Sequence, residues 1–537
     1  MTASGEHTGT CAVPEAGGGA RRPGGRAWWR RDRTVVAAIT GAAAVGYAVL
    51  SLAKLAGFRA GAYDLVIFDQ AVRSYSRFGP PVAIVKGVHN DFGPHFSVLG
   101  DHWSPILAVL APLYWIHDGP ETLLLAQAVL LAAAAVPLWV FARRALGSSV
   151  AAHLVAVAYV LAWPVVETAA FDFHEAAFAP LLTAVLLERR QAGRHAHVAL
   201  AALALLCVKE DMGLLVAGFG VVLLGQRGWR PLGGAFVVGG LGSTWLASQV
   251  LIPLFGGRAD YYWAYGALGA DAPAVVRTAL TDPLAVAAQL GTPPVKLVTL
   301  ALLLGTTLFA ALLSPLVLAA VPLLAERMLA GSFPNWWVPE YHYNAFVIVI
   351  VLAAGVDGAR RLRERRSRRP ASATAGADRE GSGPPDEAAA AERARGGRVG
   401  TRWAGTGWAA GVAAFAVATV PFFALSDLAD PATYRHDARQ RAAAEAVAAV
   451  PDHALVEAAN NLAPALSGRG TVLLWDRTPR WAPWVVADVG RRTFPFRDVD
   501  EQRVRVRMLV ERGYRVRFER EGYVVLSADR SSGGRRP

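Results

Sequence analysis

Long runs of apolar residues alternate with short polar segments over most of this chain, from residue 34 to residue 425. Many of these runs approach the roughly 17–25 residues that an α-helix needs to cross about 30 Å of hydrocarbon. The pattern therefore predicts an α-helical polytopic membrane protein with about 11 transmembrane helices. We expect the first of these helices over residues 34–56 and the last over residues 403–425. The apolar run at 106–116 is too short to span and predicts a re-entrant or interfacial helix.

Other segments of the chain interrupt or precede the apolar pattern. Residues 1–33 and 359–402 are rich in Arg, Gly and other polar or small residues, which predicts a disordered cytoplasmic N-terminus and a disordered Arg-rich cytoplasmic linker. Residues 57–103 follow the first predicted span and form a large first extracytoplasmic loop. The main transmembrane domain then extends over residues 34–358.

Residues 430–530 change to short apolar runs and predict a small extracytoplasmic α/β domain. Runs rich in Val, Leu, Trp and Tyr have strand character, and two longer segments have helical composition. The expected helices are 438–450 and 498–512, and the expected strands are 454–457, 471–475, 484–489, 514–520 and 523–528, the last two forming a hairpin around Glu521-Gly522.

Composition and charge agree with a membrane protein. Hydrophobic residues make up 54% of the 537 residues, whereas soluble domains contain about 45–50%. The net charge of +12 would suggest nucleic-acid binding in a soluble chain, but here the Arg clusters flank the apolar runs, as the positive-inside rule describes. We therefore expect no nucleic-acid partner, a cytoplasmic N-terminus and, with an odd number of spans, an extracytoplasmic C-terminal domain. The two cysteines, Cys11 and Cys207, indicate neither a disulfide framework nor a zinc site.

Two carboxylates, Asp64 and Asp69, stand in the otherwise apolar stretch 63–70, directly after the first predicted span. They are five residues apart, about 140° around an ideal helix, so they converge only if the chain bends between them. Either could act as a general base toward a hydroxyl group, and partial burial would raise its pKa usefully. The alternative is that either one caps a helix. Asp64 and Asp69 are the candidate catalytic residues.

The polar tract that follows contains residue types that bind metal ions. Asp91, His95, Asp101 and His102 could hold a hard divalent cation through oxygen, or zinc through nitrogen. Their spacing matches no recognised ligand motif, and such residues also serve as loop turns and caps. Asp101 and His102 are the candidate ligands of a possible divalent metal ion, and no other cofactor is indicated.

Further ionisable residues gather on the same predicted extracytoplasmic side. Ionisable residues at membrane depth are costly, and they indicate a functional site or an internal ion pair. A lysine there could bind a phosphate group as a point charge, although Lys209-Glu210-Asp211 could also be a self-neutralised turn. The candidate substrate-binding residues are Asp172, His174, Lys209, Glu210, Asp211, Arg258, His342 and Tyr343.

Several separated motifs resemble those of the bacterial predicted membrane proteins of the domain of unknown function 2079 family. They are Tyr-Asp-Leu-Val-Ile-Phe-Asp-Gln at 63–70, Gly-Asp-His-Trp-Ser-Pro at 100–105, Phe-Asp-Phe-His-Glu at 171–175, Val-Lys-Glu-Asp-Met-Gly at 208–213 and Ala-Asn-Asn-Leu-Ala-Pro at 459–464. That family resembles the C-type glycosyltransferases, whose first extracytoplasmic loop carries an acidic catalytic residue. Asp64 is the position that matches this acidic residue, and Asp69 is the second choice. In this sequence Asp-X4-Asp replaces the closely spaced acidic pair that is usual in those enzymes. His342-Tyr343 occupies the place of a basic or aromatic pair near the donor phosphate.

The resemblance implies an inverting glycosyltransferase of the cell membrane. It would transfer a sugar from a polyprenyl-phosphate donor to a cell-envelope glycan, lipid or protein acceptor on the extracytoplasmic face. The alternatives are a transporter or flippase of a lipid-linked or polar solute, and a non-catalytic envelope scaffold. One outward cavity lined by Asp64, Lys209 and His342 would favour the enzyme, and a midplane cavity open to both sides would favour the carrier. Dispersed polar clusters would favour the scaffold.

Overall fold

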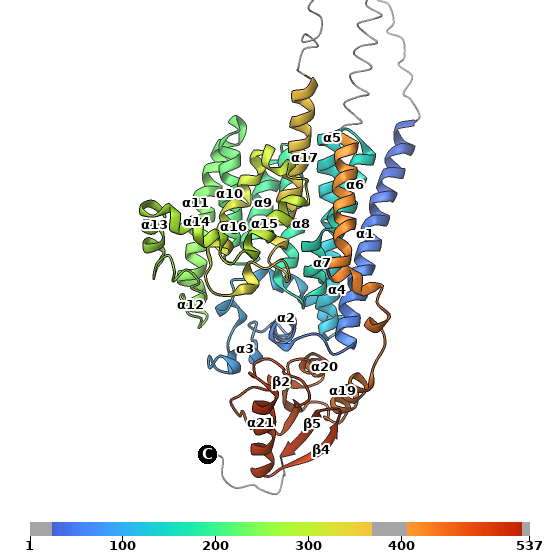
Figure 1. Ribbon diagram of the computed structural model, residues 1–537, viewed down its shortest axis with the longest axis vertical. Coiled ribbons are helices and arrows are strands. Elements are labelled where there is room, and N and C mark those ends of the chain that lie inside the picture. The colour runs from blue at the N-terminus through green and yellow to red at the C-terminus, as the bar shows by residue number, and fades with distance from the viewer. Residues whose placement is uncertain (1–23, 368–404, 529–537) are drawn as a thin grey trace, which may run out of the picture.

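The computed structural model describes residues 24–367 and 405–528, and Figure 1 shows three parts. Apolar helices form the largest part, and a small α/β domain at the C-terminal end of the chain forms the part at the opposite end. Between them lies the middle layer, residues 57–118, which contains α2 (Ile67–Ser76) and α3 (Ile84–His89).

The first half of the helical part is built around α1, whose side contacts α4, α6 and α7. Proline stands in the first turn of α4 and α7, where a helix has no need of its missing N–H group. The helices of this half are α1 (Gly24–Ala56), α4 (Pro120–Ala133), α5 (Ala135–Leu146), α6 (Ser149–Leu161), α7 (Trp163–Ala170) and α8 (Phe178–Gln191).

In the second half α10 contacts α9, α11 and α16, whereas the start of α17, where residues 345–357 are buried, packs on α5 and α8 of the first half. The helices of the second half are α9 (His195–Leu206), α10 (Met212–Leu224), α11 (Arg230–Leu246), α12 (Ile252–Leu254), α15 (Val295–Gly305), α16 (Val321–Leu329), α17 (Ala345–Ser367) and Gly405–Phe422. An exposed arm, α13 (Ala272–Thr281) and α14 (Pro283–Gly291), projects from this half (Figure 1).

The predicted number of about 11 spans is not confirmed. Within the described residues, four helices are long and apolar enough to cross a membrane, or six if two bent pairs each count as one span. Ser149–Leu161 and Trp163–Ala170, for example, follow one another at an angle of 41° instead of forming one straight helix. Short helices separated by breaks replace the continuous spans that the apolar runs suggested.

Two predicted disordered segments are partly helical. α1 begins at Gly24, and α17 extends to Ser367, inside the segment predicted as a linker. Arg360 pairs with Glu364 one turn later, at 2.6 Å, which is the spacing that supports a helix. Residues 1–23 and 368–404 lie outside the described part of the chain, so the prediction for them remains a prediction.

The middle layer is ordered, although the sequence predicted a loop over residues 57–103. Its elements are the π-helical turn η1 (Ala62–Val66), α2, α3, η2 (Val98–Gly100) and the 3₁₀ helix η3 (Pro105–Trp115). The run predicted as a short re-entrant or interfacial helix, 106–116, corresponds to η3, which packs on α2.

The C-terminal domain has the predicted small sheet, with strand order β2-β1-β3-β5-β4. β1 pairs in parallel with β2 and β3, whereas β5 pairs antiparallel with β3 and β4. Positive φ angles at Glu521 and Gly522 allow the tight turn of the β4–β5 hairpin. The elements are α19 (Ala438–Ala448), β1 (Leu455–Ala458), α20 (Ala463–Ser467), β2 (Thr471–Leu474), β3 (Trp484–Asp488), α21 (Val499–Glu511), β4 (Tyr514–Arg520) and β5 (Tyr523–Ala528).

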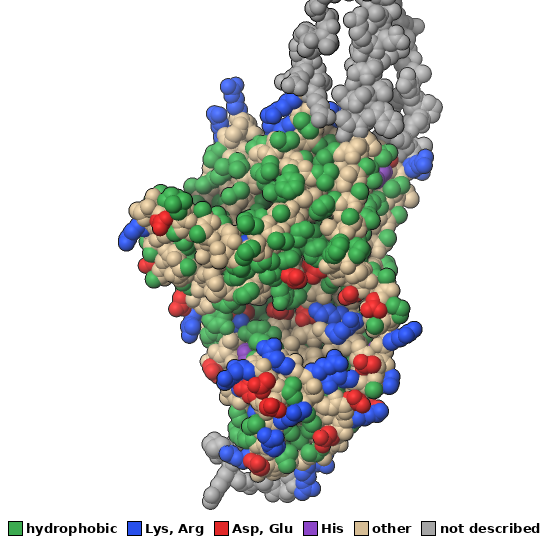
Figure 2. Space-filling model, viewed as in Figure 1, with side chains coloured by type: hydrophobic (Ala, Val, Ile, Leu, Met, Phe, Trp, Pro, Cys, Tyr) green, Lys and Arg blue, Asp and Glu red, His purple; other side chains and the backbone are tan. Residues whose placement is uncertain are grey.

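The surface divides along the same lines. Figure 2 shows apolar side chains over the helical part and mixed charges over the C-terminal domain. An apolar belt of this kind suits contact with lipid, since exposed hydrocarbon there need not be hydrated. Which compartment each end faces stays a prediction.

Candidate functional site

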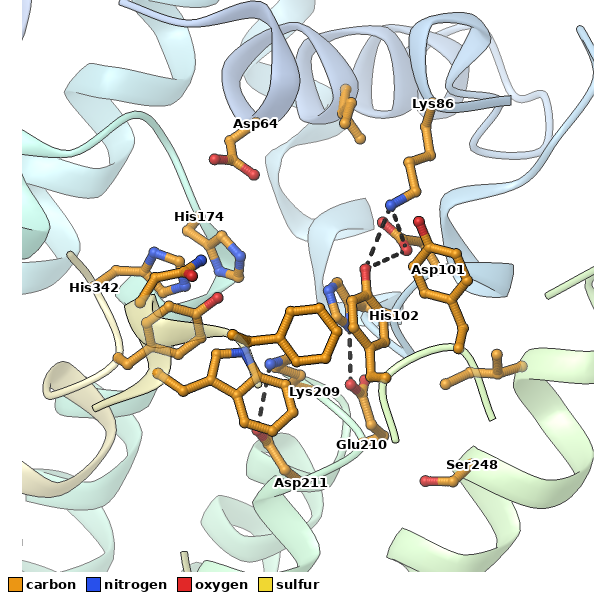
Figure 3. Close-up of a pocket in the computed structure, with 18 of the residues that line it drawn as sticks. Asp64, Lys86, Asp101, His102, His174, Lys209, Glu210, Asp211, Ser248 and His342 are labelled. Carbon is orange, nitrogen blue, oxygen red and sulfur yellow. Dashed lines mark hydrogen bonds and ion pairs between the residues drawn. The ribbon is translucent and has the colours of Figure 1, made fainter. Parts of the chain in front are cut away.

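A cavity of about 660 Å³ lies where the helical part, the middle layer and the C-terminal domain meet. Phe494 of the C-terminal domain forms part of its wall. Ser248 from the π-helical turn η6 (Ala247–Leu251), which follows α11, forms another part (Figure 3). Most of the predicted site residues line this cavity: Asp64, Asp101, His102, His174, Lys209, Glu210, Asp211, Arg258, His342 and Tyr343.

The Asp64 carboxylate points into the cavity from η1 (Figure 3). It forms no hydrogen bond or ion pair with another residue in the described part of the chain, which is unusual for a carboxylate in such surroundings. Burial raises the pKa of Asp64 well above its usual value, the nearby negative charge of Asp172 raises it further, and Lys86 opposes the shift. The carboxylate is therefore available to a ligand and is a stronger base than an ordinary aspartate.

Asp172 stands behind the turn that carries Asp64. One of its oxygens, Oδ2, accepts a hydrogen bond from the Gly61 N–H at 2.8 Å, and the other forms an ion pair with Lys54 Nζ at 3.0 Å. The contacts of this residue, which was predicted to bind substrate, fit a role in holding the η1 turn.

Asp69 has different surroundings from Asp64. It is fully buried, it pairs with Arg73 at 2.7 Å, and it accepts hydrogen bonds from Tyr114 at 2.8 Å and from Ser467. These contacts satisfy the hydrogen-bonding capacity of the carboxylate and connect α2, η3 and α20. Asp69 therefore has the surroundings of a structural residue. The structure therefore does not bring Asp69 together with Asp64.

The tripeptide at 209–211 presents all three of its side chains to the cavity. Lys209 pairs with Asp211 at 3.3 Å, whereas Glu210 pairs with His102 at 2.8 Å and accepts a hydrogen bond from the Trp103 N–H. Burial disfavours a charged His102 ring, but Glu210 and Asp101 outweigh it and raise the pKa of His102 to about 9. Lys209 is thus paired with Asp211 and not with its direct neighbour Glu210.

The predicted metal ligands have other partners. Asp101 forms an ion pair with Lys86 at 2.9 Å and accepts a hydrogen bond from Tyr262, while Nδ1 of His102 faces Glu210. Within the described residues, no group of three or more His, Cys, Asp and Glu side chains is arranged to hold a metal ion. These residues do not fit a metal site.

Two histidines are stacked on the wall beside Asp64 (Figure 3). The rings of His174 and His342 are 3.6 Å apart between centroids, and His174 Nδ1 lies 2.9 Å from Glu175. Burial and the neighbouring His174 lower the pKa of His342 well below its usual value, so its ring is neutral. Both ring nitrogens of His342 are buried and have no hydrogen-bond partner among the described residues, which leaves them for a ligand.

The two remaining predicted residues line the same cavity but differ in exposure. Arg258 is at the mouth, with 65% of its side chain exposed, and is 3.9 Å from Asp260. Tyr343 lies inside, where Lys209 stands over its ring at 5.8 Å.

The sequence interpretation missed Lys86, a buried cation on the cavity wall. Its ammonium group stands over the rings of Tyr63 and Tyr261, at 5.1 and 5.2 Å, in addition to its ion pair with Asp101. A single lysine within the apolar run 82–88 was the available signal, because an isolated charge in such a run needs a partner. It also missed Arg327, which lines the cavity from α16 and donates hydrogen bonds to Trp336 O and Tyr343 O.

Comparison with known proteins identifies a family. The chain matches no functionally curated protein. Among solved structures, the crystal structure of ArnT from Cupriavidus metallidurans in the apo state is similar to it, with 12% sequence identity and a TM-score of 0.46 over 95% of this chain and 99% of that chain. The family of predicted membrane proteins DUF2079 matches residues 54–525, nearly the whole chain, which confirms the resemblance seen in the motifs. The protein therefore belongs to the DUF2079 family of predicted membrane proteins.

Proposed function

We propose that this protein is a membrane-embedded glycosyltransferase that moves a sugar from a polyprenyl-phosphate donor to a hydroxyl group of a cell-envelope acceptor. One observation carries the proposal. The Asp64 carboxylate, without a protein partner in the described structure, faces a cavity that also presents buried cationic groups. A base and preorganised positive charge are what transfer of a sugar from a phosphate to a hydroxyl needs.

Asp64 acts as the general base in this proposal. The acceptor oxygen attacks the anomeric carbon of the sugar while its proton passes to the Asp64 carboxylate. The bond between that carbon and the phosphate oxygen breaks, and its electron pair leaves with the lipid phosphate. Attack from the face opposite the leaving group inverts the anomeric centre.

The leaving phosphate needs positive charge close to it. Lys209, with 7% of its side chain exposed, and the buried Arg327 both line the cavity, so neither would need to be desolvated during the reaction. His342 does not fit this task because its ring is neutral, and we assign its free nitrogens to hydrogen bonds with sugar hydroxyl groups. Arg258 at the mouth would meet the donor or acceptor as it enters.

The position of the cavity supports an enzyme more than a carrier or a scaffold. Asp64, Lys209 and His342 line the same cavity, and Phe494 of the C-terminal domain closes one side. The cavity thus lies at the end of the helical part, whereas a carrier places its site near the membrane midplane.

The test compares two Asp→Asn variants in a strain that lacks the chromosomal copy. Lipid-linked sugars and envelope glycans are profiled after complementation with the wild type, Asp64→Asn or Asp91→Asn. Asp91 is the matched control because it lies in the middle layer and 82% of its side chain is exposed. We expect Asp91→Asn to restore the glycan profile and Asp64→Asn to fail, with transfer slower by about 10²–10⁴-fold, the usual contribution of a general base. Full complementation by Asp64→Asn, or an unchanged profile in the deletion strain, would refute the proposal.

A further inference from the structure

The C-terminal domain contacts the turn that carries Asp64. After β1 the chain forms the loop 459–462, and Asn460 in this loop lies against the start of η1. Its backbone oxygen accepts a hydrogen bond from the Ala62 N–H at 2.8 Å. Its side-chain Oδ1 accepts from the same N–H at 3.0 Å and from the Tyr63 N–H at 3.2 Å. These N–H groups begin a helical turn and have no partner within it, so Asn460 caps η1 from a distant part of the sequence.

The close fit around Gly61 shows how little freedom this turn has. A Cβ atom at position 61 would lie 3.0 Å from Asp172 Oδ2 and 3.1 Å from Asn460 Nδ2. The chain therefore enters η1 between Asp172 on one side and Asn460 on the other. π-helical turns are rare and need support from their surroundings, and here that support comes from two other parts of the chain.

Other contacts hold the C-terminal domain in the same place. Gln70 donates a hydrogen bond to Val472 O at 3.0 Å, which ties α2 to β2. The ring of Phe494 packs on that of Tyr63, 5.2 Å between centroids, and Phe494 also lines the cavity. α20 contacts η1 itself, and Ser467 at the end of α20 donates a hydrogen bond to Asp69 in α2, so this interface continues beyond η1. These contacts hold the C-terminal domain against the middle layer on both sides of the loop 459–462.

We propose that Asn460 is a positioning residue that sets the direction of the Asp64 carboxylate, and that the C-terminal domain is therefore a working part of the site. Asn460 acts through the backbone of Ala62 and Tyr63 and need not touch a substrate. Its effect on turnover rests on the function proposed above, whereas its effect on the η1 turn does not. A small change in the direction of a base matters, because a misplacement of about 1 Å can slow a reaction about 100-fold.

The first readout needs no activity. Hydrogen exchange is followed in the full-length protein in detergent for the wild type, Asn460→Ala and Asn461→Ala. Asn461 is the matched control, since its side chain bonds to Tyr523 within the C-terminal domain. We expect exchange in residues 57–70 to become about 2–30-fold faster in Asn460→Ala, as loss of a helix cap predicts. Exchange in β4 and β5 should not change, which shows that the domain still folds. Equal exchange of residues 57–70 in the two variants would overturn the proposal.

The second readout is transfer activity. Asn460→Ala should lower kcat about 10–100-fold with little change in KM, because binding groups stay in place while the base is misdirected. Asn460→Asp keeps an oxygen acceptor and should recover most of kcat. Its added negative charge would raise the pKa of Asp64, so the acid limb of the pH profile should move to higher pH. An unchanged kcat in Asn460→Ala would refute the positioning role. If the wild type transfers no sugar, the proposed function fails and the exchange experiment alone decides the role of Asn460.

Discussion

Asp64 and Asp69 lie five residues apart, and their carboxylates have opposite surroundings. Asp69 is satisfied by Arg73, Tyr114 and Ser467, whereas Asp64 faces the cavity without a partner in the described chain. The ion pair of Asp69 could be predicted from the sequence, because Arg73 stands four residues after Asp69, the spacing of a helical ion pair. The hydrogen bond that Asp69 accepts from Ser467 could not be predicted, because Ser467 is nearly 400 positions away in the sequence.

Replacing Asp172 with asparagine tests the electrostatics of Asp64. The substitution keeps an acceptor for the Gly61 N–H but removes a negative charge that raises the pKa of Asp64. A base must be deprotonated, so activity is lost as the pH falls through this raised pKa. We expect the acid limb of kcat/KM to lie above the usual range of aspartate in the wild type and to move to lower pH in Asp172→Asn. A limb that stays in place or moves to higher pH would contradict this electrostatic account, and Asp91→Asn serves as the control.

Elements differ in how far the sequence determines them. The five strands, α19 and α21 of the C-terminal domain lie where alternation, composition and turn residues predicted them, because each is short and bounded by clear signals. The short helix α20 was not predicted. Apolar helices of 9–14 residues cannot be assigned in this way, since composition alone does not tell a full span from half of a broken one. The order of the middle layer was missed for another reason: it depends on contacts with distant segments.

The contact between α10 and α11 allows a test with two glycines. A Cβ atom at Gly240 would lie 2.4 Å from Gly213 O and 2.8 Å from Ala217 N, whereas one at Gly242 would meet nothing within 4 Å. Small residues let membrane helices approach closely, so Gly240→Ala should force α10 and α11 apart. We expect a loss of about 1–3 kcal/mol in stability, measured by unfolding in detergent, against less than about 0.5 kcal/mol for Gly242→Ala. Equal stability of the two variants would show that the helices can move apart without cost.

At the scale of the whole molecule, the site belongs to three parts of the chain at once. Most of the predicted site residues line one cavity, and they were predicted from their residue types and from the family resemblance. Lys86, Arg327 and Asn460 escaped prediction because their roles come from neighbours that are far away in sequence.

Asp69→Asn tests how the three parts are held together. Losing the charge of Asp69 weakens its buried pair with Arg73, although Asp118 still faces that arginine at 2.5 Å. We expect the protein to lose about 3 kcal/mol of stability, near the lower end for a broken buried ion pair. Limited proteolysis should then release the C-terminal domain sooner. If Asp69→Asn leaves stability unchanged but abolishes turnover, Asp69 takes part in the reaction instead.

The cap that Asn460 provides has a consequence for biosynthesis. Ala62 and Asn460 are 398 positions apart, so a ribosome that has made the Asp64 turn needs about 20–80 s more before it reaches the residue that completes it. During that interval the first helices of the nascent chain can already lie in lipid, but the η1 turn that carries Asp64 still lacks its cap. Under the function proposed above, such a chain would neither transfer nor hydrolyse a lipid-linked sugar before the cap is made. A truncated product that stops before residue 460 would be inserted and inert.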